Sequence, residues 1–418
     1  MHGLAEFCVE IKILPHHVKN LAMYQKSMKT TFRRMMSGAA LTLAAVATLL
    51  TACKKDQPDT LACNDIETTT TLTNHRTKGD GVDYSVGCKI FVRSKLIIEA
   101  GTSIEFAQGG GIIIEPGGSI EIRGTAGNRV VLRGESSARG TWAGIMIYSN
   151  DASNLIENAD ISGGGGEEFN SNGDLGNVIV YNDARLTVRN SSFSNSAAYG
   201  LNVLGNTDVT LSNLSFTSNA TPLALPASQA HKIDAASSYT SNDNQFVEIF
   251  VADIAETVTW RSLPVPYRIS PANNGMFTIV GIVDNGGLTV EAGADLQFSA
   301  DCGIGVYNSA YISMEGTASQ NVSLRGINSD AGSWMGVYFE SNNTANSLDF
   351  VNITGAGSGA FNSNNNVASV IAFANSALSV TNCSISNGLV CGIYVGANVN
   401  FTESNNSFAN LPSNTCTD

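Results

Sequence analysis

After residue 75 the chain alternates apolar and polar positions in short runs. Apolar residues recur two positions apart, and Gly or Asn separates the runs, as at Ile112/Ile114, Ile120/Ile122, Val130/Leu132 and Ile145/Ile147. A period of two predicts β-strands bounded by turns. Amphipathic helices need longer runs with a period of 3.6 residues, and the sequence after residue 52 has none. We therefore expect an all-β protein built from many short strands.

The chain also contains an internal duplication at an offset of 192 residues. Segment 96–165 aligns with segment 288–357 without a gap, and 25 of the 70 aligned residues are identical. The match includes Trp142 and Trp334, each inside a Gly-x-Trp-x-Gly sequence. An extended match at one fixed offset indicates a duplicated structural unit rather than chance similarity.

A shorter period of 23 residues lies inside each copy. Residues 186–193 recur at 209–216, and residues 378–385 recur at 401–408. Periods of about 20–50 residues are typical of stacked repeats, in which each unit buries its apolar side against its neighbours. Short strands with this period predict a parallel β-solenoid with about 23 residues per coil, in which like residues stack about 4.8 Å apart.

Asparagines recur at the same place in successive repeats. Asn190 is followed 23 residues later by Asn213, and Asn382 by Asn405. Asn tolerates the left-handed backbone conformation of tight turns, and stacked amides can hydrogen-bond to one another. We expect Asn190 with Asn213, and Asn382 with Asn405, to form an asparagine ladder at a turn.

The repeat resembles that of a known family. The patterns LxVEAGxxIxF, GTAxxxVxLRG, GxWxGI and LxxVxISGxG, found across residues 75–415, are similar to those of right-handed parallel β-helix repeat lipoproteins with a pectin-lyase-like fold. The resemblance implies a right-handed parallel β-helix. It implies little about activity, because the members that the chain most resembles are largely uncharacterised.

The N-terminal region has the features of a secretory signal. An apolar run at 38–50 follows basic residues, and it is too short to span a membrane. It ends in Leu50-Thr51-Ala52-Cys53, which resembles a bacterial lipobox, and this predicts cleavage before Cys53 and lipid attachment to its thiol. A start at Met28 would give a signal of ordinary length. Lys54, rather than Asp, after the cysteine argues by resemblance for the outer membrane of a Gram-negative bacterium, on its periplasmic or external face.

These features predict the following organisation. Residues 1–52 form the removed signal region, and residues 53–75 form the lipidated cysteine with a polar tether and cap. Residues 76–225 form the first half of the β-helix, residues 226–287 form connecting coils, and residues 288–418 form the second half.

The net charge of the chain limits which kinds of partner the protein is expected to bind. The whole chain has a net charge of −13 from 23 Lys/Arg and 36 Asp/Glu. Removal of residues 1–52, which hold six Lys/Arg and two Glu, leaves 17 basic and 34 acidic residues and a net charge of −17. This balance disfavours nucleic acid as a partner and suits a soluble domain that contacts the membrane only through its anchor.

Six cysteines besides Cys53 remain after processing, an even number that indicates disulfides in an exported protein. We favour a Cys63–Cys88 bridge at the first coils. Cys383 and Cys391 occur only in the second copy, so we favour a Cys383–Cys391 bridge that staples the last coils, with Cys391–Cys416 as the alternative. No CxxC pair accompanies the two histidines that follow Cys53, so no metal site is expected.

One acidic loop is the best candidate for ligand binding. Glu167 and Glu168 follow four glycines, and Asp174 comes shortly after, whereas the second copy of this loop, residues 355–362, has no acid. Carboxylates in such a loop could hold Ca²⁺ or sugar hydroxyls. The alternative is a solvated loop, and no other cofactor is expected.

Enzymatic alternatives receive less support. Asn206-Thr207-Asp208 superficially resembles the first motif of polygalacturonase-like enzymes, but the sequence has no Asp-Asp pair and no His-Gly after the signal. Arg133 and Arg325 match between the copies, but an arginine at a strand end often packs its stem and stays solvated. Trp142 and Trp334 are either sugar-stacking platforms or covers for the core.

No catalytic residue is therefore assigned. The expected function is that of a lipid-anchored, non-catalytic binding or adhesin-like scaffold on the cell surface, with polysaccharide or cell-surface glycan as its partner. The alternative is a polysaccharide lyase or glycoside hydrolase of pectin-lyase-like fold. A cluster of three or more acids with an arginine in one solvent-facing groove would favour that alternative.

Overall fold

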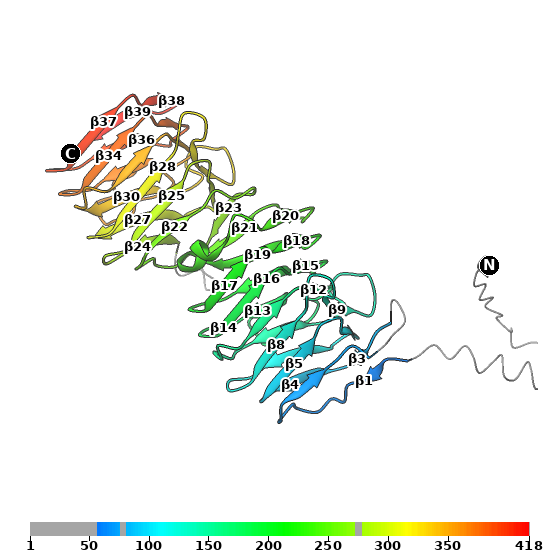
Figure 1. The fold of residues 1–418 in the computed structure, drawn as a ribbon. Coiled ribbons are helices and arrows are strands. Elements are labelled where there is room, and N and C mark those ends of the chain that lie inside the picture. The colour runs from blue at the N-terminus through cyan, green and yellow to red at the C-terminus, as the bar shows by residue number, and fades with distance from the viewer. Residues whose placement is uncertain (1–56, 76–80, 272–277, 418) are drawn as a thin grey trace, which may run out of the picture. The chain divides into compact units, whose positions relative to one another are not determined.

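The computed structural model describes residues 57–75, 81–271 and 278–417, and the predicted signal region and Cys53 lie outside these residues. Residues 58–418 form one compact unit. Its strands pair in parallel and recur in turn through stacked sheets, as Figure 1 shows. The predicted fold class, an all-β parallel β-helix, is confirmed.

One sheet runs through most of the stack. Its thirteen strands, in spatial order, are β4 (Lys89–Val92), β7 (Gly111–Ile114), β10 (Gly144–Ile147), β13 (Gly176–Val180), β16 (Tyr199–Val203), β19 (Thr221–Pro226), β21 (Val247–Phe250), β23 (Tyr267–Ser270), β26 (Asp295–Phe298), β29 (Val322–Gly326), β32 (Val351–Thr354), β35 (Ser384–Ser386) and β38 (Ser407–Ala409).

Two sheets accompany it in the N-terminal half. The eight-stranded sheet contains β1 (Asp59–Thr60), β3 (Tyr84–Val86), β6 (Ser103–Phe106), β9 (Val130–Gly134), β12 (Ala159–Ser162), β15 (Ser192–Ser194), β18 (Ser215–Thr217) and β20 (Ser238–Thr240). A six-stranded sheet contains β2 (Thr70–Leu72), β5 (Lys95–Glu99), β8 (Ser119–Arg123), β11 (Leu155–Glu157), β14 (Arg185–Arg189) and β17 (Asp208–Ser212).

Two further six-stranded sheets accompany it in the C-terminal half. One contains β22 (Thr257–Trp260), β25 (Gly287–Glu291), β28 (Tyr311–Glu315), β31 (Ser347–Asp349), β34 (Ala377–Thr381) and β37 (Asn400–Ser404). The other contains β24 (Ile279–Ile282), β27 (Gly303–Asn308), β30 (Gly336–Ser341), β33 (Val370–Ala372), β36 (Cys391–Val395) and β39 (Ser413–Thr417). A short 3₁₀ helix, η2 (Ala227–Lys232), lies between the halves.

Coil length follows the register of the strands. Val178 pairs with Leu201, and Ile385 pairs with Phe408, each 23 residues further on. Inserted loops lengthen other coils: Ile161 pairs with Phe193, 32 residues on. The basic coil thus has the predicted length, and the longer ones carry loops outside the stack.

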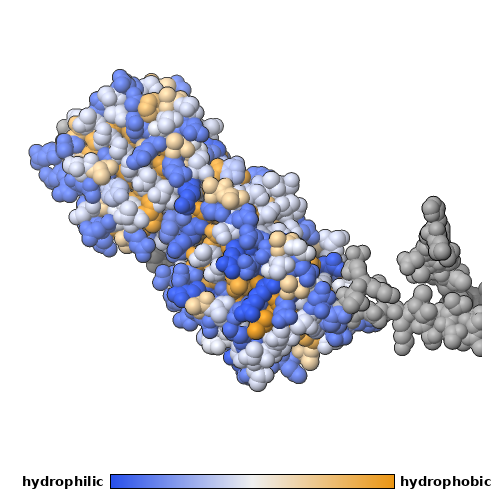
Figure 2. Space-filling model, in the orientation of Figure 1, coloured by the Kyte–Doolittle hydropathy of each residue, from blue (hydrophilic) through white to orange (hydrophobic). Residues whose placement is uncertain are grey.

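Apolar side chains fill the inside of the coils from end to end. A single cluster of buried residues extends from Leu72 to Ile393. Flat rings stack within it: Phe193, Phe216 and Tyr239 lie on successive coils with centroids 5.4 Å apart. On the face shown in Figure 2, hydrophilic residues alternate with short apolar strips, so part of the apolar surface also lies outside the core.

The predicted asparagine ladders are present. Asn213 Nδ2 donates to Asn190 Oδ1 at 2.8 Å, and Asn405 Nδ2 donates to Asn382 Oδ1 at 3.3 Å. All four residues have φ between 52° and 55°. The sequence interpretation of these turns is confirmed.

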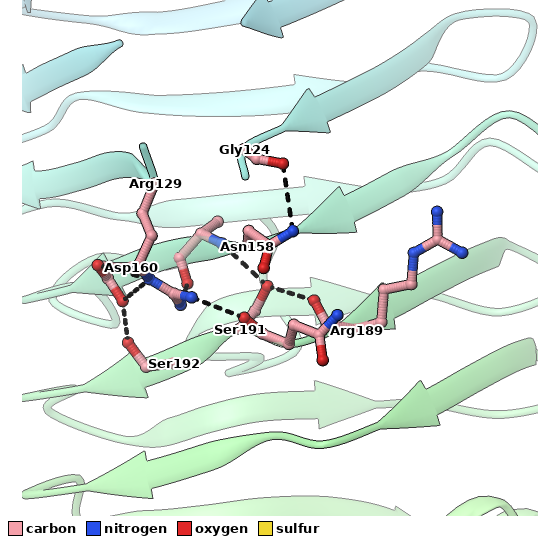
Figure 3. Close-up of polar contacts among 9 residues, drawn as sticks. Gly124, Arg129, Asn158, Asp160, Arg189, Ser191 and Ser192 are labelled. Carbon is pink, nitrogen blue, oxygen red and sulfur yellow. Dashed lines mark hydrogen bonds and ion pairs between the residues drawn. The ribbon is translucent and has the colours of Figure 1, made fainter. Parts of the chain in front are cut away.

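The turn that contains Asn190 also carries a polar clamp, drawn in Figure 3. Arg129 Nε donates to both carboxylate oxygens of Asp160 at 2.9 Å, and its other nitrogens donate to the carbonyls of Ala159 and Asn190. Ser192 Oγ donates to Asp160 Oδ1 at 2.5 Å. One arginine therefore ties three successive coils together at this turn.

The two copies of the duplication are out of phase with the sheets. Strand β9 belongs to the eight-stranded sheet, but its counterpart β29 belongs to the thirteen-stranded sheet. Likewise β10 belongs to the thirteen-stranded sheet and its counterpart β30 to the β24–β39 sheet. The second copy therefore enters the stack one strand position later, and equivalent side chains do not line up along one sheet. The change occurs between β19 and β23, around η2.

The disulfides require one correction. The structure joins Cys63 to Cys88, as favoured from sequence, with Cα atoms 5.9 Å apart. It joins Cys391 to Cys416, on the neighbouring strands β36 and β39, and leaves Cys383 a free thiol.

The favoured Cys383–Cys391 bridge is therefore wrong. The reason is that Cys383 packs in the main core, whereas Cys391 packs in a separate cluster with Tyr338 and Ile371. Burial raises the pKa of the Cys383 thiol to about 11, which makes it unreactive at neutral pH.

Candidate functional site

An apolar row runs along the outer face of the thirteen-stranded sheet in the N-terminal half. Ile113, Met146 and Ile179 are directly registered on β7, β10 and β13 and are buried outside the main core. A second row follows at the strand ends, with Tyr181, Leu204, Pro226 and Phe250 on successive coils. These rows give the outside of the solenoid an apolar surface with partly buried aromatic rings.

The second row forms the floor of a groove of about 720 Å³. Polar side chains stand around this floor: Asn172 and Asp174 come from the acidic loop, and Asn182 and Asn206 come from the turns that follow β13 and β16. Asn172 Nδ2 donates to the Tyr181 hydroxyl at 2.9 Å and so ties the loop to the aromatic row. An apolar floor with a few polar groups at its sides is the usual form of a ligand site.

The acidic loop is packed onto the sheet and is not simply solvated. The Phe169 ring lies so close to Gly111 that a Cβ on this glycine would be 3.0 Å from two ring atoms. In the second copy, Phe361 lies against Gly303 in the same manner. Each copy therefore closes its loop onto the sheet by seating a phenylalanine on a glycine.

The three acids predicted as ligands do not converge on one point. The Glu167 carboxylate accepts from Lys89 Nζ at 3.2 Å, and the same ammonium donates to the Glu168 carbonyl at 2.8 Å. Lys89 thus binds the loop to β4. Glu167 serves this anchoring contact, and only Asp174 reaches the groove.

Asp174 is buried, with 5% of its surface exposed. Asn170 Nδ2 donates to its Oδ2 at 3.2 Å. Burial raises the pKa of Asp174, with a further contribution from the charge of Glu168. A buried carboxyl at the side of a groove is well placed to accept hydrogen bonds from a ligand.

A second hollow, of about 400 Å³, adjoins the groove and shares Asn206 and Ser228 with it. Its remaining lining comes from the start of β17, from η2 and from the segment before β22. The chemistry-bearing residues of this lining are Thr207, Asp208, Gln229, His231, Lys232, Asp253 and Glu256. The sequence does not predict this hollow, although the Asn206-Thr207-Asp208 motif forms part of its lining.

The acids of this hollow differ in their surroundings. Asp208 Oδ2 accepts from Arg185 Nε at 2.8 Å and is largely exposed. Burial, and then the charge of Asp284, raise the pKa of Asp253. Burial, and then the charge of Lys232, lower the pKa of His231, so this imidazole is neutral at pH 7.

Other sequence candidates turn out to be structural. Trp142 and Trp334 are 1% and 0% exposed, and each stacks on a core phenylalanine with ring centroids 4.1 and 4.2 Å apart. They cover the core and cannot stack on a sugar. Arg133 and Arg325 form ion pairs with Glu105 and Asp295 on neighbouring strands.

The described residues contain no group of three or more His, Cys, Asp or Glu side chains that could hold a metal ion. Within the same residues, no helix has the length and apolar character needed to cross a membrane.

Comparisons with protein-family models, curated proteins and solved structures found no match.

Proposed function

We propose that this protein is a lipid-anchored β-helix of a bacterial outer membrane that binds a glycan without cleaving it. The groove over Tyr181 and Phe250 carries the proposal. Aromatic faces suit the apolar faces of sugar rings, and the surrounding Asn and Asp side chains suit their hydroxyls. The resemblance of the repeat to β-helix lipoproteins and the lipobox at Leu50–Cys53 support the anchored location, on either the periplasmic or the external face.

The chain offers a matched pair of variants to test glycan binding. Tyr181 borders the groove, and its counterpart in the second copy, Phe373, borders neither the groove nor the hollow. Each ring packs beside another aromatic ring, Tyr148 or Tyr338, so Tyr181→Ala and Phe373→Ala should perturb the fold alike.

The assay is titration of the full chain, in detergent, with neutral oligosaccharides built from glucose, mannose or xylose. Loss of an aromatic contact at the centre of a site typically costs tenfold or more in affinity. We expect this loss for Tyr181→Ala and no change for Phe373→Ala. Equal loss in both variants, or no binding by the unaltered protein, would reject glycan binding in the groove.

The anchor is tested separately with Cys53→Ser. The variant should be unlipidated and should leave the membrane fraction for the soluble one. Membrane association that persists with intact processing would contradict lipid attachment at Cys53.

One observation favours glycoside hydrolysis as a second candidate function. Asp208, Asp253 and Glu256 line the same hollow, and Arg185 is bound to Asp208. Asp253, with its raised pKa, would be the general acid, and Glu256 the base or nucleophile. Release of reducing ends from a neutral glycan, abolished by Asp253→Asn, would establish this activity and overturn the non-catalytic proposal.

A further inference from the structure

We infer that the hollow beside η2 is a subsite for one uncharged, hydroxyl-bearing sugar unit of the same glycan that lies in the groove. This inference rests on the proposed function and deepens it. It commits the ligand to a chain of at least two neutral units, one over the aromatic floor and the next in the hollow.

The position of the hollow supports the connection. Asn206 and Ser228 line both spaces, so the two spaces adjoin along these residues. With volumes of about 720 and 400 Å³, each space lies in the range of about 300–1,000 Å³ that is usual for small-molecule sites.

Two side chains of the hollow have buried polar atoms without a hydrogen-bond partner in the described part of the chain. They are Thr207 Oγ1 and Gln229 Oε1. Thr207 is only 4% exposed. Buried polar atoms in native proteins nearly always have a partner, so two orphans in one hollow indicate that something else bonds to them.

The chemistry of these atoms indicates the ligand. The threonine hydroxyl can donate and accept, and the glutamine oxygen accepts. A sugar hydroxyl can also donate and accept, so adjacent hydroxyls of one ring can satisfy both atoms. A purely acceptor ligand such as a carboxylate could not bond to the glutamine oxygen.

Charge excludes uronic acids by a separate argument. Asp253 and Glu256 line the hollow, Asp174 lines the groove, and Lys232 is the single Lys or Arg among the lining residues of the two spaces. An anionic sugar would meet more negative than positive charge, and such juxtaposition is a common means of rejecting a wrong ligand.

The second copy provides a variant for the test. The counterpart of Thr207 is Val399, which packs partly against the core. Thr207→Val therefore removes the hydroxyl, keeps the shape and uses a residue that the other copy accepts at this position. Thr207→Ser restores the hydroxyl. Thr210→Val, on the strand β17 that follows Thr207 and outside both linings, is the control for the substitution itself.

The experiment measures the affinity of the full chain, in detergent, for neutral oligosaccharides of one to six units and for hexagalacturonate. We expect affinity to rise on going from one unit to two or three. Thr207→Val should lose about tenfold for the longer ligands and nothing for the single sugar, because one buried hydrogen bond is worth about that factor. Thr207→Ser should recover most of the loss, and Thr210→Val should match the unaltered protein.

The outcomes separate the two proposals. If binding needs Tyr181 but Thr207→Val has no effect at any length, the subsite is wrong and glycan binding stands. If hexagalacturonate binds as well as the neutral hexamers, the assignment to uncharged sugars is wrong. If the unaltered protein binds no neutral glycan, both proposals fail.

Discussion

A buried asparagine ladder offers the sharpest test of how the coils around the groove are held. Asn219 lies in the turn between β18 and β19 and is fully buried. Its Oδ1 accepts from the Ser196 N–H at 3.0 Å, and its Nδ2 donates to the Phe193 carbonyl at 2.9 Å and to Asn242 Oδ1 at 3.0 Å. This side chain thus connects three successive coils from inside the stack.

The free energy of unfolding that Asn219→Ala costs depends on which buried polar groups lose their hydrogen-bond partners. Asn242 Oδ1 keeps a bond from the Asn219 backbone N–H, at 3.0 Å, so it is not orphaned. The Ser196 N–H loses its partner in a buried position, whereas the Phe193 carbonyl still pairs with the neighbouring strand β18. One buried group left unpaired costs about 1–3 kcal/mol, so we expect a destabilisation of about 2 kcal/mol.

The assay is hydrogen exchange, read amide by amide, because a solenoid opens locally as well as globally. A loss of about 2 kcal/mol corresponds to exchange about thirtyfold faster at the amides of β15, β16, β18 and β19. The control is Asn213→Gly in the exposed ladder. Glycine adopts the left-handed backbone freely, and this variant loses one exposed hydrogen bond, at a cost of about 1 kcal/mol or less. Equal effects of the two variants would refute the reasoning.

Two further predictions concern buried groups beside the groove and under the loops. Burial raises the pKa of Asp174, so this carboxyl binds its proton more tightly in the folded protein than in the unfolded one. The stability of the protein therefore falls as pH rises from the unfolded pKa of about 3.9 through the higher folded pKa. Asp174→Asn should therefore raise the melting temperature at pH 7, with a difference that disappears near pH 3; a constant difference would contradict this. Trp142 Nε1 donates to the Ser162 carbonyl at 2.8 Å, so Trp142→Phe should lower the free energy of chemical unfolding by about 1–3 kcal/mol without changing the affinity for glycans. A sugar-stacking role would instead lower the affinity and leave the unfolding free energy unchanged.

Most of the fold could be predicted from sequence because its determinants are local. The period-two alternation determines which side chains enter the core. The 23-residue period determines which residues stack on one another in successive coils. The ladders at Asn190 and Asn213 follow from the same period together with the backbone preference of asparagine. These patterns are visible without knowledge of any long-range contact.

The groove and hollow could not be predicted in the same way. Tyr181, Leu204 and Phe250 have no common motif, and they become neighbours only because their coils stack in register. The composition of the acidic loop predicts a ligand site, but Glu167 is bound by Lys89, 78 residues earlier in the sequence. The Cys383–Cys391 pairing failed for a similar reason, since sequence spacing does not show which side of a sheet a cysteine faces.

The duplication explains why the groove is confined to one place. Positions that build the coil are matched in both copies: Asn154 and Asn346 each donate to the carbonyl five residues before them and accept from a backbone N–H of the coil before. Two positions that line the proposed site differ between the copies, since Asp174 and Thr207 correspond to Asn366 and Val399.

The change of strand position around η2 has a further consequence. The strands that precede Tyr181 and Phe373, β13 and β33, belong to different sheets, so the second copy does not continue the aromatic row. The row instead ends at β21, beside the hollow, and this is the part of the stack that has no counterpart as clear in the other copy. A site at this junction can change its side chains without disturbing the repeated positions that hold the coils together. We therefore expect substitutions in the groove and hollow to alter binding without disrupting the repeated coils, and substitutions at the matched positions to destabilise the coils.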